Sequence, residues 1–132
     1  MKVDKGTFIY KVDDHAGEMY FIASGSADMY CKKIVVATVP EGGYVGIQVL
    51  YRQSHGFGCK ARTDCKLYAW RRSDMQSVFE DFPLMYEKLV TIAKERSEKF
   101  RKNYNMILKN GRRGNIFNAG PSKVFFNYYY NF

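Results

Sequence analysis

Six short strand-like segments, the first of them rich in aromatic and β-branched residues, lie within the first seventy residues, and turn-forming residues separate them. The segments are Thr7–Val12, Met19–Ala23, Ala27–Cys31, Ile34–Val39, Cys59–Ala61 and Cys65–Trp70. The turns include DDHAGE at Asp13–Glu18 and the breaker PEGG at Pro40–Gly43. Many short strands joined by such turns are typical of an antiparallel roll, barrel or sandwich.

The pattern changes to a helical one after the last of these segments. Ser73, with Gln76 three residues later, predicts a capping box at the start of a short helix. Pro83 ends that helix and suits the first turn of the next. From Leu84 to Leu108, apolar residues recur every three or four positions, which predicts one long amphipathic helix. We therefore predict an α+β fold: an antiparallel, jelly-roll-like β-roll, then a short helix and a long C-terminal helix.

The length of 132 residues fits one domain, which we place at residues 1–110. Residues 111–132 form a tail of uncertain structure that ends in the aromatic string FFNYYYNF. No apolar run reaches the length of a membrane span, and we expect no secretion leader. The odd set Cys31, Cys59 and Cys65 predicts free thiols in a reducing compartment.

The formal net charge of +8 is compatible with nucleic acid, an acidic membrane, a phosphorylated ligand or simply a solvated surface. Much of the excess lies in Lys94–Arg113, where cations suit the end of a helix. A basic nucleic-acid-binding module that uses this stretch and the aromatic tail is an alternative, although nucleic acid is not the partner we favour. No nucleophile–base–acid set, paired carboxylates or metal-ligand spacing appears, so we expect neither an enzyme nor a metal site.

Three strings, in the right order, resemble the cyclic nucleotide-binding domain family. EMYFIASG at Glu18–Gly25 is similar to its early roll, and EGGYVGIQVL at Glu41–Leu50 to the start of its phosphate-binding cassette. Cys59–Phe100 is similar to the cassette's end, the last strands and the closing helices. The resemblance covers roughly Lys5–Leu108 and is strongest to hyperpolarisation-activated, cyclic nucleotide-gated and ether-a-go-go-like cation channels. Because that family has a helix and a complete first strand before the position of Lys5, we expect a fragment of a larger membrane protein.

The resemblance implies a pocket for cAMP or cGMP, with no other cofactor. In such cassettes, backbone N–H groups at a short helix and an arginine fork bind the cyclic phosphate. A glutamate accepts hydrogen bonds from the ribose hydroxyl, and the last helix closes over the purine as a switch. The candidate ligand-binding residues are Gly46, Ile47, Gln48, Arg52, His55, Gly56, Phe57, Arg96 and Phe100.

The side chains at the cassette positions depart from the family pattern. Gly46 matches the family glycine, but Ile47 stands at the carboxylate and His55 at the arginine. Gly56 replaces a threonine that helps to bind phosphate, and Phe57 replaces a small alanine and could fill the pocket as a plug. A histidine has no guanidinium fork and is mostly neutral at neutral pH.

Other residues supply possible replacements. Arg52, predicted on the short helix, could act as a substitute cation, Arg96 matches an arginine that contacts the base, and Phe100 matches an apolar capping position. Losing the phosphate contact costs about 1.5–3 kcal/mol, and an unmet ribose hydroxyl about 1–3 kcal/mol more. Together these losses correspond to roughly a hundredfold to ten-thousandfold in affinity.

Some residues also have simpler interpretations. We expect His55 to be a solvated loop residue rather than a pH-tunable phosphate contact, and His15 to lie at the surface. Tyr68 and Trp70 are expected to pack in the core rather than against a base.

The prediction is therefore a cytosolic regulatory domain, for gating or assembly, of a cation channel such as a potassium channel. Its degenerate site would bind cAMP or cGMP weakly or not at all. The alternative is a working cyclic nucleotide sensor of a channel or of a sodium/proton exchanger. Expected partners are the other subunits of a tetrameric channel, and the aromatic tail as an intramolecular occupant of the pocket. The expected location is the cytoplasmic face of a membrane, with membrane attachment only through the parent protein.

Overall fold

A computed structural model describes residues 1–111 of the chain. Its strands are β1 (Lys2–Val3), β2 (Phe8–Tyr10), β3 (Glu18–Ser24), β4 (Ala27–Cys31), β5 (Ile34–Val39), β6 (Tyr44–Val45), β7 (Gly58–Ala61) and β8 (Cys65–Arg71). A short 3-10 helix, η1 (Ile47–Leu50), follows β6, and the helices α1 (Arg72–Asp81) and α2 (Pro83–Gly111) follow β8. None of the described helices is long and apolar enough to cross a bilayer.

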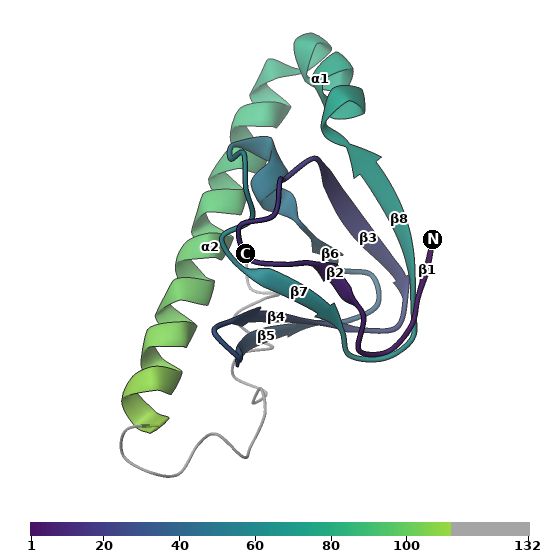
Figure 1. Ribbon diagram of the computed structural model, residues 1–132. Helices are drawn as coiled ribbons and strands as arrows, with labels where there is room; N and C mark the ends of the chain where they lie inside the picture. Colours follow the sequence, from purple (N-terminus) through teal and green to yellow (C-terminus); the bar gives the residue numbers. More distant parts are fainter. Residues whose placement is uncertain (112–132) are drawn as a thin grey trace.

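The strands form two antiparallel four-stranded sheets that face each other. The first sheet has the order β1-β8-β3-β6, and the second has the order β2-β7-β4-β5. Between them lies an apolar core in which Ile22, Val36 and Leu67 are fully buried. The helix α2 runs along one side of the roll, where it packs on β5 and η1 (Figure 1). The predicted α+β roll with a short and a long helix is therefore confirmed.

A second apolar cluster joins η1 to the two helices. Val49 and Leu50 of η1 pack with Met75 and Phe79 of α1 and with Ala93 of α2. Met75 and Phe79 lie at helical spacing in α1, so the sequence pattern that predicted the helix also describes its buried face. The cluster fixes the place where the roll meets the helices, which is the place that positions the candidate site.

Two local predictions about this region are wrong. The helix α1 begins at Arg72 with Arg71 at its N-cap and without a side-chain capping bond, so Ser73 lies inside the helix. Tyr68 and Trp70 are 56% and 38% exposed, because they share the strand face of Lys66 while Leu67 faces the core. Instead of entering the core, Trp70 lies 6.2 Å from the ring of Phe79.

The structure also adds strands that the sequence did not predict. The two-residue strand β1 pairs with β8, and the two-residue strand β6 pairs with β3. Pro83 begins α2, as predicted. The domain boundary at residue 110 stays a prediction, and the predicted tail lies outside the described residues.

Candidate functional site

Gly46 forms the turn that leads from β6 into η1. Its φ of 82° lies in the left-handed region that glycine tolerates best. A Cβ atom there would lie 3.0 Å from the carbonyl oxygen of Glu18 and 3.3 Å from the Cα atom of Met19. Backbone shape and close packing therefore both favour glycine, and the cassette turn predicted from the sequence is present.

The residues after this turn border a narrow space beneath α2. Its lining consists of Gly46, Ile47 and Gln48 from the cassette, Arg96 and Phe100 from α2, and Met29, Tyr44 and Val45 from the roll. The space is too narrow to hold a water molecule. Five of the nine predicted site residues thus meet in one place, and a nucleotide can enter only if the surrounding groups move apart.

Arg96 connects α2 to the roll. The side chain is 3% exposed and donates a hydrogen bond of 3.3 Å to the carbonyl oxygen of Tyr44. Its guanidinium carbon lies 4.0 Å from the centre of the Tyr44 ring, a cation–π contact. Arg96 is therefore already bound to protein groups that a ligand would have to compete with. Tyr44, directly before Val45 and Gly46, was missed in the sequence because nothing local marks it.

Ile47 and Gln48 are both buried but differ in what they offer a ligand. Ile47 is 2% exposed and packs in the cluster between η1 and the helices, so it has no atom that accepts a hydrogen bond. Gln48 is 1% exposed, and its Oε1 atom has no hydrogen-bond donor among the described residues. A buried acceptor without a donor costs free energy. Gln48 is thus the side chain of the cassette that could accept a hydrogen bond from a hydroxyl group.

His55 is buried, contrary to the expectation of a solvated loop residue. It is 2% exposed, and its ring stacks on Tyr10 with 3.6 Å between the ring centres. Its backbone bonds to that of Asp13 and Asp14, which holds the loop against the turn after β2. Burial lowers the pKa of His55 to about 4, although the charge of Asp14 opposes this shift. The imidazole is therefore neutral at neutral pH, and His55 does not line the narrow space.

Arg52 and Gly56 also lie outside the narrow space. The prediction that Arg52 lies on the short helix is wrong, because η1 ends at Leu50. Arg52 is exposed, and its guanidinium folds over Gly56, where a Cβ atom would lie 2.8 Å from the Nη1 atom. A cation is thus present beside the cassette loop but not inside the predicted pocket.

Phe57 contacts the last helix. Its ring meets Phe100 edge-on, with 5.5 Å between the centres and 78° between the planes. Phe100 is 2% exposed and belongs to the core between the sheets. This pair helps to hold α2 against the roll, and of the two residues only Phe100 lines the narrow space.

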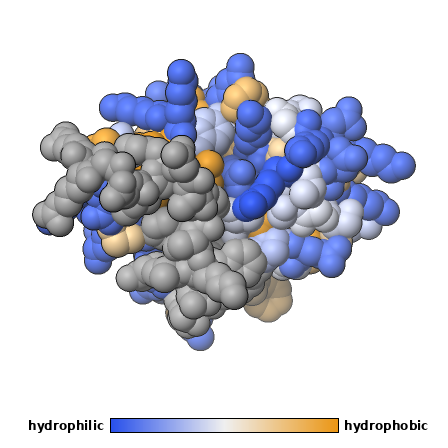
Figure 2. All heavy atoms as spheres, turned by 90° about the horizontal axis from the view of Figure 1, so that it is seen from below, coloured by the Kyte–Doolittle hydropathy of each residue, from blue (hydrophilic) through white to orange (hydrophobic). Residues whose placement is uncertain are grey.

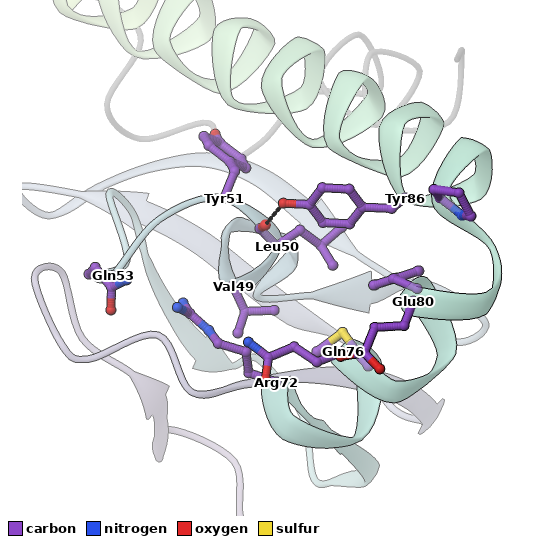
Figure 3. A pocket seen from close by; sticks show the side chains of 11 residues that line it. Val49, Leu50, Tyr51, Gln53, Arg72, Gln76, Glu80 and Tyr86 are labelled. Atoms are coloured by element: carbon purple, nitrogen blue, oxygen red, sulfur yellow. Dashed lines mark hydrogen bonds between the residues drawn. The ribbon is translucent and has the colours of Figure 1, made fainter.

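The start of α2 is attached to η1 across a groove of about 650 Å³. Figure 3 shows Val49 and Leu50 of η1 and Arg72 and Glu80 of α1 among the residues that line it. The hydroxyl of Tyr86 donates a hydrogen bond of 2.9 Å to the carbonyl oxygen of Leu50. Further along α2, the Tyr51 and Ser97 hydroxyls are 2.9 Å apart. Sequence reasoning missed these contacts because the partners lie 36 and 46 residues apart.

A buried asparagine side chain also attaches the second half of α2 to the roll. Asn103 is 2% exposed and donates a hydrogen bond of 3.1 Å to the carbonyl oxygen of Val36 in β5.

Among residues 1–111, no group of three His, Cys, Asp or Glu side chains lies close enough to hold a metal ion. Cys59 and Cys65 are free thiols, as expected, and both are buried, which raises the pKa of each.

Known proteins share the sequence pattern and the fold of this chain. The profile of the family described as "Cyclic nucleotide-binding domain" matches residues 1–82. The human potassium/sodium hyperpolarization-activated cyclic nucleotide-gated channel 1 is 27% identical over 105 residues, which is 79% of this chain and 12% of the channel. Human channel 4 of the same group is also 27% identical, over 78% of this chain and 9% of that channel. The chain therefore spans about a tenth of the length of these relatives.

Solved structures show the same fold at lower identity. The catabolite activator protein of Thermus thermophilus superimposes with a TM-score of 0.66 at 19% identity, over 86% of this chain and 62% of that one. A structure of cAMP-bound PfPKA-R superimposes with a TM-score of 0.66 at 18% identity, over 80% of this chain and 36% of that one. The family match covers more than half of the chain and agrees with the observed roll, cassette turn and closing helix. The chain therefore belongs to the cyclic nucleotide-binding domain family.

Proposed function

We propose that this chain is a cytosolic regulatory domain of a cation channel whose nucleotide site binds cAMP and cGMP weakly or not at all. The observation that carries the proposal is the narrow space beneath α2, which has no room for a water molecule. The uncharged Ile47 and the neutral, buried His55 support it, because neither pairs with a phosphate or a ribose hydroxyl as a carboxylate and a guanidinium do. The similarity to hyperpolarisation-activated channels supports the channel as the parent protein.

The regulatory role rests on how α2 is attached. Tyr86 joins the start of the helix to η1, Arg96 joins its middle to β6, and Asn103 joins its second half to β5. Any rearrangement of η1 therefore alters the contacts of α2, which is how a two-state helix transmits a signal. In the parent channel, the other subunits of a tetramer at the cytoplasmic face of the membrane would receive this motion.

Calorimetric titration of the chain with cAMP and with cGMP tests the proposal directly. We expect no heat of binding at micromolar nucleotide, and saturation only in the millimolar range or not at all. A dissociation constant in the micromolar range for either nucleotide would contradict the degenerate site. Gel filtration with light scattering measures whether the isolated chain forms oligomers.

A working sensor, of a channel or an exchanger, is the second candidate, and Gln48 is the observation that favours it. Its buried Oε1 atom offers an acceptor to a ribose hydroxyl where Ile47 offers none. In that case Arg96 would turn from Tyr44 to the ligand, and Arg52 would supply charge from the loop. The sensor predicts micromolar binding that Gln48→Leu, Arg96→Ala and Arg52→Ala each weaken measurably. If micromolar binding is found and Gln48→Leu leaves it unchanged, Gln48 has no part in it.

A further inference from the structure

A second hollow lies on the outer face of the second sheet, away from the narrow space. It has a volume of about 460 Å³, and its lining includes Lys5, Lys33, Lys60, Arg62, Phe8 and Tyr30. Seen from below, where β4 and β5 lie in Figure 1, most of the surface that the described residues form is hydrophilic (Figure 2). We refer to this concavity as the basic hollow.

The cations of the basic hollow outnumber its carboxylates. The carboxylate in its lining is Asp28, which accepts a hydrogen bond of 2.8 Å from Thr38 and lies 3.9 Å from Arg62. Within residues 1–111, no carboxylate lies within ion-pair distance of the Lys5, Lys33 or Lys60 ammonium groups. Three lysines therefore line one concavity without a carboxylate of the described chain within ion-pair distance.

Aromatic rings support these cations. Phe8 is 44% exposed, and the Nζ atoms of Lys60 and Lys11 lie 5.3 Å and 5.2 Å from the centre of its ring. Phe8 in turn lies 5.7 Å from the ring of Tyr30. Because two ammonium groups already use the Phe8 ring, the ring holds cations in place and is not a bare platform for a nucleic-acid base.

Gly58 allows Tyr30 to take this position. The two residues pair across β4 and β7, and a Cβ atom on Gly58 would lie 2.2 Å from the Tyr30 ring. The absence of a side chain at Gly58 therefore leaves room for the Tyr30 ring where it lies beside the basic hollow.

The turn between β4 and β5 brings another lysine to the rim at a conformational cost. Lys32 and Lys33 are its two central residues, with φ of 49° and 68°. Two-residue hairpin turns with positive φ at both positions favour Asn-Gly, and lysine is strained there. A strained residue that persists points to a role for its side chain. Lys33 lines the basic hollow, so the strained turn and the charge cluster occur together.

We propose that the basic hollow binds a compact anion that carries several phosphate groups, such as an inositol polyphosphate or the phosphorylated headgroup of a lipid. Several ammonium groups without a carboxylate partner in the described chain match several phosphate groups on one small scaffold. The volume suits a headgroup-sized molecule. This binding is independent of the nucleotide site, because none of the cations of the basic hollow lines the narrow space.

Calorimetry with inositol hexakisphosphate at physiological ionic strength is the first test. We expect saturable binding, weakened roughly fivefold by Lys60→Gln. The matched control is Lys66→Gln, which removes the same charge from an exposed position of the first sheet and should leave affinity unchanged. No saturable binding by the unmodified chain, or equal weakening by both variants, would overturn the proposal.

The double variant Lys32→Asn/Lys33→Gly separates the ligand role from a structural one. It relieves the positive-φ strain, so the melting temperature should rise, while affinity for inositol hexakisphosphate should fall. A higher melting temperature with unchanged affinity would exclude Lys33 from the site and contradict the proposal.

Vesicles distinguish the two sources of the phosphates. Sedimentation with phosphatidylcholine vesicles that contain phosphatidylinositol 4,5-bisphosphate, compared with phosphatidylcholine alone, reports binding of the lipid headgroup. Binding to both probes, sensitive to Lys60→Gln, assigns the lipid headgroup, whereas binding to inositol hexakisphosphate alone assigns the free anion. A single-stranded oligonucleotide of equal charge that binds more tightly, with the same sensitivity to Lys60→Gln, would overturn the proposal in favour of nucleic acid.

Discussion

Strand β4 separates two hollows of opposite character. Met29 lines the narrow space beneath α2, whereas Asp28 and Tyr30, its neighbours, line the basic hollow on the outer face. The inner space has no room for a water molecule, and the guanidinium of Arg96 that borders it is held against Tyr44. The outer hollow is open and has several ammonium groups. The two hollows differ in this way because alternate side chains of β4 point to opposite faces of the sheet.

The largest effect should come from restoring charge to the inner site. The double variant Ile47→Glu/His55→Arg introduces the carboxylate and the guanidinium that the family uses. We expect affinity for cAMP to rise by up to roughly a hundredfold, because Ile47 lines the narrow space and a carboxylate there can accept a hydrogen bond from the ribose hydroxyl, whereas position 55 lies against Tyr10 outside that space. Titration calorimetry measures the change. The uncharged variant Ile47→Leu/His55→Gln is the control, and a folded double variant with unchanged affinity would show that the space, not the charge, prevents binding.

Adjacent positions of β4 should differ in their effect on stability. Met29 is 1% exposed, so Met29→Ala should lower the free energy of unfolding by about 2–5 kcal/mol through lost contacts and a cavity. Asp28→Asn keeps an acceptor for Thr38 and should cost less than about 1 kcal/mol. Urea denaturation of both variants gives the two values. Equal losses would mean that the outer face contributes as much to folding as the inner one.

The loop that holds His55 should make stability depend on pH. The pKa of His55 is about 4 in the folded chain and 6.5 in an ordinary environment, so the unfolded chain binds the extra proton between these values. The contribution of His55 to the free energy of unfolding should therefore be fully present above pH 6.5 and should fall as the pH decreases towards 4. His55→Phe keeps a ring against Tyr10 and should reduce this slope. Carboxylates titrate in both proteins, so the difference between the two pH profiles is decisive, and identical profiles would contradict the buried neutral imidazole.

The smallest effect concerns the attachment of α2 at the groove. Tyr86→Phe removes the hydrogen bond to Leu50 and should cost about 1 kcal/mol. Amide hydrogen exchange should speed up in the first turns of α2 but not in its middle. Tyr104→Phe is the control, since within residues 1–111 that hydroxyl makes no hydrogen bond. Faster exchange along all of α2 would show that the helix is released as one unit.

Local patterns explain what was predictable from the sequence. The alternation and turn residues that mark β3, β4 and β5 lie within contiguous stretches, and so do the helical spacing and Pro83 that define α2. The turn at Gly46 and the uncharged Ile47 were likewise visible in one short string. These features depend on neighbours in the chain, which is why the roll, the long helix and the cassette were expected correctly.

Some predictions of burial were wrong where the packing of the core decides which side chains are buried. Alternation placed Tyr68 and Trp70 on one face of β8, but only the second sheet determines that Leu67 faces inward. His55 was expected in solvent, yet Tyr10, 45 residues earlier in the chain, covers its ring. Neither outcome has a local signal, because each depends on strands that meet only after folding.

Local features of the sequence specify the α+β roll, its two closing helices and the uncharged residue at position 47, since periodicity, turn residues and side-chain chemistry are local properties. Tertiary structure alone decided the two hollows. It brought Arg96 and Phe100 of α2 to the cassette, and it gathered Lys5, Lys33 and Lys60 from separate strands and turns onto one outer face. The physical reason is that strand pairing and helix docking join residues distant in sequence, and only those contacts decide which charges are buried, paired or left open to a ligand.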